Sequence, residues 1–369
     1  MDYRAALLKG LKVSPSLQKR QRPTPKINLQ QMWSSLISQN PPADEWRPNL
    51  PPDIMVLIMQ RIGWYDVLMN VKLVCKYWYV LSKDPSIWRV IEIRKDVSAT
   101  KLREDMRILT YEEYVSQVPL ARRAMLDYCK YHEYEAEVYR KVEKALHEMV
   151  MHVIDLSCGQ LHDLCFQKFG SDNLLKYIYQ RSRQLTRLRL QECMVCCYNY
   201  ESLDYDRYIT LKGMIQMLRN LPLLEELELS YTRIFGKGVQ IVGRCCPHLK
   251  KFILNQRTYG YTRNPKCDKQ ALAIANSMPG LRHLQLFGNR MTISGLMAIL
   301  DNCQQLEYLD LRQCKNLGKV LKEAEFETKL RQQIKHVRFL KDSTEDYEFD
   351  SDEGISDGYI GSDCSSELD

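Results

Sequence analysis

The sequence predicts an α/β chain in which a small three-helix module is followed by a helical connector and then by a stack of strand–helix units. Three observations predict this architecture. A tryptophan-rich apolar block follows a basic, proline-interrupted arm, the pattern L-x-x-L-x-L recurs through the second half, and an acidic segment follows the repeats. The expected segments are the arm at 1–43, the helical module at 44–94, the connector at 95–150, the repeats at 151–341 and the tail at 342–369.

Composition places the chain among soluble globular proteins. It has 369 residues, of which 45% are hydrophobic and 27% charged, enough to bury a sizeable core. No apolar stretch approaches the ~18 residues that a membrane helix needs, and charged residues stand where a signal peptide would carry its apolar core. Thirteen cysteines, an odd number, then indicate reduced thiols in the cytosol or nucleus. We expect no membrane partner.

The formal net charge of +7 is unevenly distributed. Residues 342–369 hold eleven acidic residues and no lysine or arginine, so the preceding residues carry +18. So basic a body could attract nucleic acid or an acidic protein, or be partly neutralised by its own tail. The Ser, Gly and Asp content of the tail predicts a disordered segment, because it cannot bury enough apolar area to order itself.

The N-terminal arm, residues Met1–Ala43, is basic and interrupted by five prolines, which predicts disorder. Its cluster Lys19–Lys26 can serve as a nuclear import signal, although short basic runs are common in such arms. The expected location is therefore the nucleus, the cytoplasm or both.

The helical module begins at Leu50–Asp53, where two prolines and an acid precede an apolar stripe at helical spacing. The stripe consists of Ile54, Leu57, Ile58 and Ile62. The other side of the same helix is also apolar, with Met55, Val56 and Met59. Three short helices cannot cover both sides with their own residues, so a further surface must cover the second one. Gly63 should end this helix and Asp66 should cap the next, before Asp84-Pro85 breaks the chain.

This module resembles the F-box, the segment by which adaptor proteins bind Skp1. The resemblance rests on Leu50-Pro51, Ile54, Leu57-Ile58, Asp66, Leu68, Val74-Cys75-Lys76, Trp78, Asp84-Pro85 and Trp88. It implies that Leu50, Pro51, Ile54 and Ile58 lie at or near the Skp1 interface, while Trp78 and Trp88 hold the module together. The alternative is a three-helix bundle whose apolar excess packs against the next domain of the same chain. The connector, with an amphipathic helical pattern over Arg122–Met149, has no assigned role.

The second half contains leucine-rich repeats, about seven units of one strand and one helix that stack into a solenoid. Five units fit L-x-x-L-x-L, namely Leu185–Leu190, Leu224–Leu229, Leu249–Leu254, Leu281–Leu286 and Leu306–Leu311. Weaker copies are expected at Met151–Leu156 and Ile334–Phe339. The position at which such repeats place Asn or Cys to bond the turning backbone is filled by Cys193, Asn289 and Cys314.

Together the two regions resemble the plant F-box/leucine-rich-repeat proteins grouped as Skp1-interacting partners. The phrases that carry this resemblance begin at Leu221, Ala271, Met278 and Asp342. It implies a substrate-recognition adaptor of a Skp1–cullin–F-box ubiquitin ligase, in contact with Skp1 directly, with cullin indirectly and with an unknown protein substrate. The basic arm and the tyrosine-rich insertion at 194–208 depart from the family.

Catalytic and metal-binding patterns are incomplete. Cys193-x-x-Cys196-Cys197 has the spacing of half a zinc site, and Cys158, His162 and Cys165 could form another set, but neither has a second close pair. No nucleophile motif, phosphate loop or dinucleotide fingerprint is present in the sequence. We therefore expect a non-catalytic subunit without a metal or cofactor, which acts by raising the local concentration of its substrate.

The residues between the leucines of each strand should project from the concave face of the repeats. We expect the substrate there, on Ile253, Phe287 and Tyr308 of three successive strands, within a rim of Lys251, His283, Gln285, Asp310 and Arg312. The alternative is that the C-terminal unit or the acidic tail covers this patch. Two other functions remain open. One is nucleic-acid binding, which the mixed charges of the strands disfavour, and the other is Skp1 binding without a cullin.

Overall fold

The computed structural model describes residues 50–105, 128–193, 208–232, 234–256, 266–318 and 324–338. The expected basic arm, residues 194–207 of the insertion and the acidic tail lie outside these residues. Within the described parts, no single helix is long and apolar enough to cross a membrane, although the bent pair Pro52–Ile62 and Trp64–Leu73 meets the same criterion jointly by length and composition.

The helical module contains three α-helices and two short 3-10 helices. They are α3 (Pro52–Ile62), α4 (Trp64–Met69), η2 (Val71–Leu73), α5 (Lys76–Leu81) and η3 (Pro85–Arg89). As predicted, α3 starts at a proline and ends at Gly63, whose φ of 97° is accessible to glycine at little cost. The prediction that Asp66 caps the second helix is wrong, because Gly63 precedes α4 and Asp66 lies inside its first turn.

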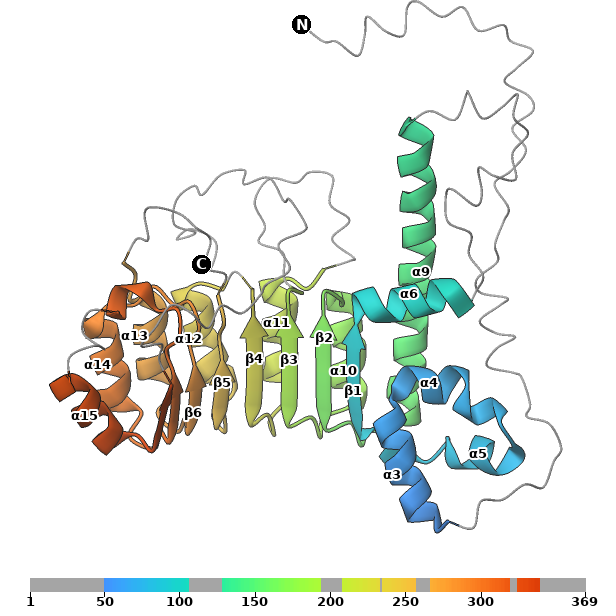
Figure 1. The fold of residues 1–369 in the computed structure, drawn as a ribbon, viewed down its shortest axis with the longest axis horizontal. Coiled ribbons are helices and arrows are strands. Elements are labelled where there is room, and N and C mark those ends of the chain that lie inside the picture. Colours follow the sequence, from blue (N-terminus) through green and yellow to red (C-terminus); the bar gives the residue numbers. More distant parts are fainter. Residues whose placement is uncertain are drawn as a thin grey trace, which may run out of the picture. The chain divides into compact units, whose positions relative to one another are not determined.

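In the remaining described residues, eight parallel strands form one sheet and follow sequence order (Figure 1). The strands are β1 (Val90–Arg94), β2 (Asp163–Gln167), β3 (Arg187–Gln191), β4 (Glu226–Ser230), β5 (Lys251–Ile253), β6 (His283–Gln285), β7 (Tyr308–Asp310) and β8 (His336–Arg338). The helices after β1 are α6 (Lys95–Asp105), α9 (Tyr128–Leu156), α10 (Asp172–Arg181), α11 (Leu211–Arg219), α12 (Gly236–Cys245), α13 (Lys269–Ser277), α14 (Ile293–Asn302) and α15 (Ala324–Gln333). A 3-10 turn, η5 (Lys315–Leu317), follows β7.

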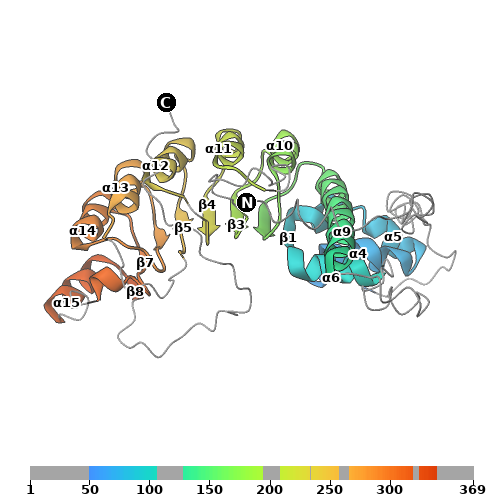
Figure 2. The ribbon, with the colours of Figure 1, turned by 90° about the horizontal axis from the view of Figure 1, so that it is seen from above.

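Helices α10 to α14 cover one face of this sheet, and the opposite face carries no helix from them (Figure 2). We call the uncovered side the open face. Side chains alternate between the two faces because successive residues of a strand point in opposite directions. One inward row pairs Ile91, Leu164, Leu188, Leu227, Phe252, Leu284 and Leu309 across adjacent strands, and each of them is buried. Burial of this row against the helices holds neighbouring units together.

Five expected strands lie where L-x-x-L-x-L predicts them, as β3 to β7, and Ile334–Phe339 overlaps β8. The unit expected at Met151–Leu156 is wrong, since that segment is the last part of the helix α9. Its apolar residues continue the helical spacing of Val142, Leu146, Met149 and Val153, all buried. The sheet instead begins with β1 and β2, which the pattern did not predict.

Side-chain contacts between successive units recur at the start of the covering helices. Asp172 accepts hydrogen bonds from the Thr210 backbone N (2.8 Å) and Oγ1 (2.6 Å) of the next unit. Asp268 accepts the same two bonds from Thr292, at 2.6 and 2.7 Å. The thiol of Cys193 donates to the Phe166 carbonyl, and that of Cys314 to the Leu286 carbonyl, each at 3.1 Å. These cysteines therefore bond the backbone of the preceding unit, as the repeat predicts.

Asp310 and Arg312, which we expected at the rim of the substrate site, are buried. Asp310 is 0% exposed and Arg312 9%, and the guanidinium of Arg312 donates to both Asp310 carboxylate oxygens at 2.8 to 3.0 Å. The expectation that these two side chains form an accessible rim of the substrate site is therefore wrong. Their charges neutralise each other at the end of β7, where a carboxylate without a partner would be costly to bury.

We predict that Asp310→Ala lowers the free energy of unfolding by about 3 kcal/mol, because it removes the carboxylate that neutralises the buried Arg312 charge. Chemical denaturation measures this loss. Asp301→Ala, which removes an exposed carboxylate at the end of α14, is the matched control and should change stability by less than about 0.5 kcal/mol. An unchanged Asp310→Ala stability would contradict a structural role for the pair.

Candidate functional site

Helix α3 has two apolar sides, and the chain buries one of them. Met55 and Met59 are buried, and α3 contacts η3 and α4. The opposite side is exposed, with Leu50 at 45%, Ile54 at 40%, Leu57 at 53%, Ile58 at 37% and Ile62 at 39%. We call these five side chains the α3 face. The sequence also allowed the next domain of the chain to cover this apolar surface. Among the described residues it does not, because the five side chains stay exposed.

The Skp1-binding positions expected from the sequence all lie on or beside the α3 face. Leu50, Ile54 and Ile58 belong to it, and Pro51 is exposed next to Leu50. Val74 and Val80 add exposed apolar surface in the same module, and α5 has no buried residue. Leaving so much apolar surface in water is unfavourable for a module this small, so the arrangement is typical of a protein-binding surface.

The described tryptophans of the module, Trp64, Trp78 and Trp88, have different environments. Trp88 is buried, and its Nε1 donates to the Ser82 carbonyl at 2.9 Å, which ties η3 to the end of α5. Trp78 is half-buried within α5. A third tryptophan, Trp64, donates from Nε1 to the Glu92 carbonyl of β1 at 2.7 Å. Trp64 therefore fixes α4 to the first strand of the sheet.

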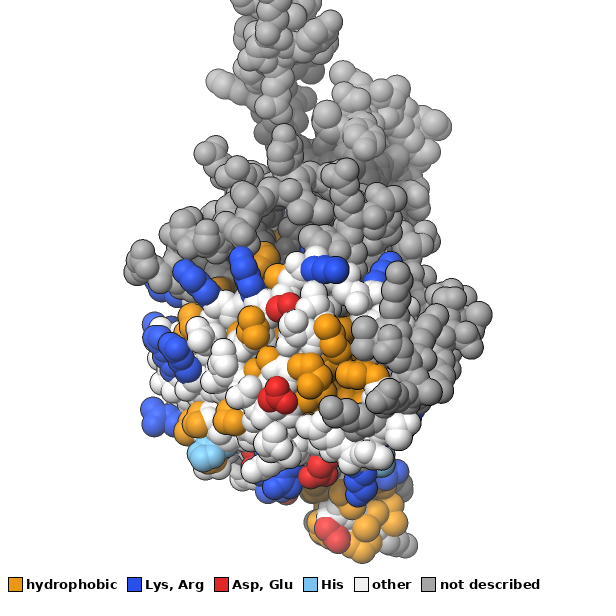
Figure 3. Space-filling view, turned by 90° about the vertical axis from the view of Figure 1, so that its left-hand side faces the viewer, with side chains coloured by type: hydrophobic (Ala, Val, Ile, Leu, Met, Phe, Trp, Pro, Cys, Tyr) orange, Lys and Arg blue, Asp and Glu red, His pale blue; other side chains and the backbone are white. Residues whose placement is uncertain are grey.

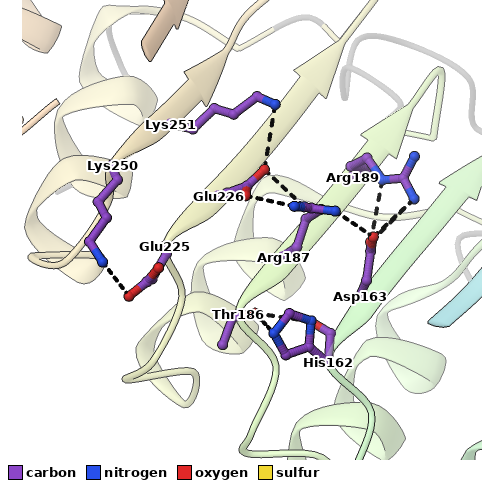
Figure 4. Close-up of polar contacts among 9 residues, drawn as sticks. All are labelled: His162, Asp163, Thr186, Arg187, Arg189, Glu225, Glu226, Lys250 and Lys251. Carbon is purple, nitrogen blue, oxygen red and sulfur yellow. Dashed lines mark hydrogen bonds and ion pairs between the residues drawn. The ribbon is translucent and has the colours of Figure 1, made fainter. Parts of the chain in front are cut away.

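The open face of β2 to β5 carries a ladder of opposite charges (Figure 4). Arg187 bonds Asp163 on one side at 3.0 Å and Glu226 on the other at 2.7 and 2.8 Å. Arg189 also bonds Asp163, at 3.2 Å, and Lys251 lies 3.5 Å from Glu226. The side chains that could bind a charged ligand are thus largely occupied by one another.

These contacts shift the pKa values of Glu226 and Arg187. Burial alone would raise the pKa of Glu226, but the hydrogen bond from Arg187 and the positive charge of Lys251 outweigh it and lower that pKa. The hydrogen bonds of Arg187 to Glu226 and Asp163 raise the pKa of its guanidinium, despite partial burial. Glu226 and Arg187 are therefore both ionised near neutral pH.

The ladder continues into hydrogen bonds with uncharged side chains at the ends of the strands. Glu228 accepts from Gln191 at 2.8 Å and from Ser230 at 2.6 Å. Asn255 donates to Ser230 at 2.9 Å and accepts from Gln285 at 3.0 Å. Gln285, one of the expected substrate-binding residues, is therefore engaged in this network.

The expected substrate patch is staggered across the strands. Register pairs Lys251 with His283 and His283 with Tyr308, while Ile253 pairs with Gln285. Phe287 follows the end of β6, so the expectation that Ile253, Phe287 and Tyr308 lie in three successive strands holds for Ile253 in β5 and Tyr308 in β7 but not for Phe287.

The patch nevertheless brings apolar and aromatic groups together. The rings of His283 and Tyr308 stack with centroids 3.9 Å apart and planes at 7°. Ile253, Phe287 and Lys251 are each half-buried. Burial and the positive charge of Lys251 lower the pKa of His283, against the carboxylates of Glu226 and Asp310. His283 is therefore mainly neutral near pH 7.

The buried thiols are poorly suited to nucleophilic chemistry. Burial raises the pKa of Cys165, Cys193 and Cys314 to about 12 each. A thiolate is the reactive form, so these groups are unreactive near neutral pH. Among the described residues, no group of three or more His, Cys, Asp or Glu side chains could hold a metal ion. Cys196 and Cys197 of the considered zinc half-site lie outside the described residues.

A further apolar area lies at the C-terminal end of the sheet. Figure 3 views this end and shows hydrophobic side chains gathered at its centre, with Lys and Arg side chains toward its edge. A shallow depression between α14 and α15 is lined by Met297, Leu300, Phe326, Leu330 and Gln333. Leu300 and Leu330 are buried, so this area mainly joins the last helix to its neighbour.

Residues 48–94 match the F-box-like family, which places that family on the module bearing the α3 face. Three Arabidopsis thaliana proteins illustrate the wider similarity. The F-box protein SKIP19 is 34% identical over 304 residues, covering 82% of this chain and 80% of its own length. The putative F-box/LRR-repeat protein 9 is 33% identical over 271 residues, covering 73% and 88%.

The third relative is longer. The putative F-box/LRR-repeat protein 23 is 35% identical over 296 residues, which cover 80% of this chain but 53% of that protein. The similarity thus extends from the helical module through most of the sheet. On these grounds the chain belongs to the family of plant F-box/LRR-repeat and Skp1-interacting-partner proteins.

Proposed function

We propose that this chain is a substrate-recognition adaptor of a Skp1–cullin–F-box ubiquitin ligase. In this proposal the α3 face binds a Skp1-like protein, which connects the chain indirectly to a cullin, and the open face holds a protein substrate. The chain itself makes and breaks no bond. It raises the effective concentration of the substrate beside a charged ubiquitin-conjugating enzyme. A location in the nucleus or the cytoplasm remains our expectation.

The α3 face is the observation that carries this proposal. A small helical module that buries Met55 and Met59 but exposes four large aliphatic side chains on the same helix, and Leu50 just before it, is built for a protein partner. Its position within the F-box-like match makes a Skp1-like protein the expected partner. Relatives whose names include SKIP support the same assignment.

We interpret the strand–helix units as leucine-rich repeats that present the substrate surface. The inward leucines of L-x-x-L-x-L and the cross-unit bonds of Cys193 and Cys314 support this interpretation. Within the open face, Ile253, Phe287, Tyr308, Lys251, His283 and Gln285 remain the proposed substrate contacts. Asp310 and Arg312 support the patch from the interior.

The ion-pair ladder argues against nucleic acid as the main ligand. Arg187 and Arg189 already bond carboxylates, and Lys251 lies near Glu226. Phosphate binding would require these pairs to be broken, whereas a nucleic-acid groove should present mostly uncompensated positive charge. The protein-binding function is therefore the one we favour for this face. Whether Skp1 binding leads to a cullin is decided by co-purification of a cullin with the wild-type chain.

We predict that Leu50→Ala combined with Ile58→Ala abolishes co-purification with Skp1. Truncation of buried interface anchors commonly costs about 2 kcal/mol each, so the pair should weaken affinity roughly a thousandfold. Isothermal titration of purified Skp1 into each chain measures the change. The matched control is Leu223→Ala combined with Leu272→Ala, which truncates two similarly exposed leucines outside the module. Equal Skp1 affinity for all three chains would refute the proposed role of the α3 face.

We also predict that Phe287→Ala combined with Tyr308→Ala reduces substrate capture while the melting temperature and Skp1 binding stay unchanged. Both side chains are half-buried, so their truncation should remove contact area without opening the core. Proteins retained by wild-type bait under proteasome blockade, and lost by the double variant, provide the readout. A fall of several degrees in melting temperature would instead assign the two rings to core packing.

A further inference from the structure

The open face changes character between β4 and β5. On β2 to β4 the ladder joins Asp163, Arg187, Arg189 and Glu226, and Lys251 of β5 lies at its end, 3.5 Å from Glu226. On β5 to β8 the described outward side chains include one carboxylate, Asp310, which is buried against Arg312. What remains at the surface, apart from the half-buried Gln285, is Lys251 together with imidazole, aromatic and aliphatic side chains. We call this set the β5–β8 patch, consisting of Lys251, Ile253, His283, Phe287, Tyr308 and His336.

The chain leaves the sheet directly beside this patch. Strand β8 ends at Arg338, and its His336 pairs with Tyr308. Phe349 follows Arg338 by eleven residues. Because an extended residue spans at most about 3.3–3.6 Å, eleven residues reach about 36–40 Å. Strands lie about 4.7–4.9 Å apart, so β5 is only about 15 Å from β8 and within that reach.

The sequence that follows matches the patch in chemistry. Residues 345–350 read Glu-Asp-Tyr-Glu-Phe-Asp, so two aromatic side chains alternate with carboxylates. In an extended segment Tyr347 and Phe349 would point to the same side, since side chains repeat every second residue. Their rings suit the apolar and aromatic members of the patch, and a flanking carboxylate suits the ammonium group of Lys251, which lies 3.5 Å from Glu226.

We propose that the segment Glu345–Asp350 of the acidic tail docks on the β5–β8 patch of its own chain. The short tether makes this contact intramolecular, with an effective concentration in the millimolar range. An intrinsic Kd of similar size therefore suffices for substantial occupancy, and a protein ligand of higher affinity can still displace the tail. That such a ligand is a ubiquitination substrate rests on the proposed function, whereas the tail contact itself does not.

The docking can be mapped directly in the full-length chain. p-Benzoylphenylalanine is placed at position 349, or at position 359 as a control elsewhere in the tail, and cross-linked peptides are identified by mass spectrometry. We expect position 349 to cross-link to peptides from β5 to β8 of the same chain, and position 359 to do so several-fold less. Cross-links to the α14–α15 depression, to the α3 face or between two copies would each overturn the proposal, as would none at all.

A competition experiment tests occupancy. A fluorescent peptide with the sequence of residues 342–353 is titrated with the full-length chain and with its Tyr347→Ser, Phe349→Ser variant. The peptide should bind the variant at least about twofold more tightly, because an intrinsic Kd equal to the effective concentration leaves the patch half occupied by the tail in the wild-type chain. Equal affinity for the two chains would contradict docking in cis.

Charge reversal in the Tyr347→Ser, Phe349→Ser background identifies the surface. Lys251→Glu should weaken peptide binding at least tenfold, whereas Lys212→Glu, at an exposed site on α11, should leave it unchanged. Equal effects of the two reversals would assign the binding to the general positive charge of the body and overturn the proposal. Skp1 affinity is measured on the same samples. If the wild-type chain does not bind Skp1, the proposed function is refuted. The tail contact is decided separately, by the affinity of the peptide for each chain.

Discussion

The parallel pairing of β1 with β2 is the contact on which the placement of the helical module depends. Strand β1 directly follows η3, and its Ile91 and Ile93 are buried in the inward rows that the later strands continue. The His162 backbone N–H donates to the Arg89 carbonyl at 2.8 Å, which extends this junction into η3. The indole Nε1 of Trp64 donates a hydrogen bond to the Glu92 carbonyl of the same strand. The module therefore joins the first strand of the sheet without an intervening linker, and its helix α4 supplies a hydrogen bond to the edge strand.

Much of the sheet could be predicted because its leucines are regular, and the failures have identifiable causes. In β2 the pattern is present as Leu161-His-Asp-Leu164-Cys-Phe166, with phenylalanine as the last apolar residue. In β1 it is Trp88-Arg-Val-Ile91-Glu-Ile93, with tryptophan as the first. Both fit the inward rows, but substituting aromatic residues and isoleucine for leucine hides them from a leucine template. Met151–Leu156 matched the leucine template by composition. The apolar residues before it stand at helical spacing, however, and the segment continues their helix.

The candidate surfaces were predictable to different degrees. The α3 face could be found because one helix carries apolar residues on both sides, although the sequence does not say that Met55 and Met59 occupy the buried side. The substrate patch was predicted less well, since a polar residue between two leucines can face solvent or a partner within the chain. Asp310 and Arg312 illustrate the second case. The ladder of Asp163, Arg187 and Glu226 joins residues of three units, so only the register of the sheet brings them together.

The two proposed binding surfaces rest on different physical interactions. The α3 face would gain stability by burying aliphatic area, an effect that salt screens little, whereas the open face combines ion pairs with a small aromatic patch. Hydrogen–deuterium exchange of the full-length chain, with and without purified Skp1, shows most directly which of the two surfaces binds Skp1. The account predicts slower exchange over α3, residues 52–62, with β5 to β8 unchanged. Slower exchange in β5 to β8 with α3 unaffected would contradict it.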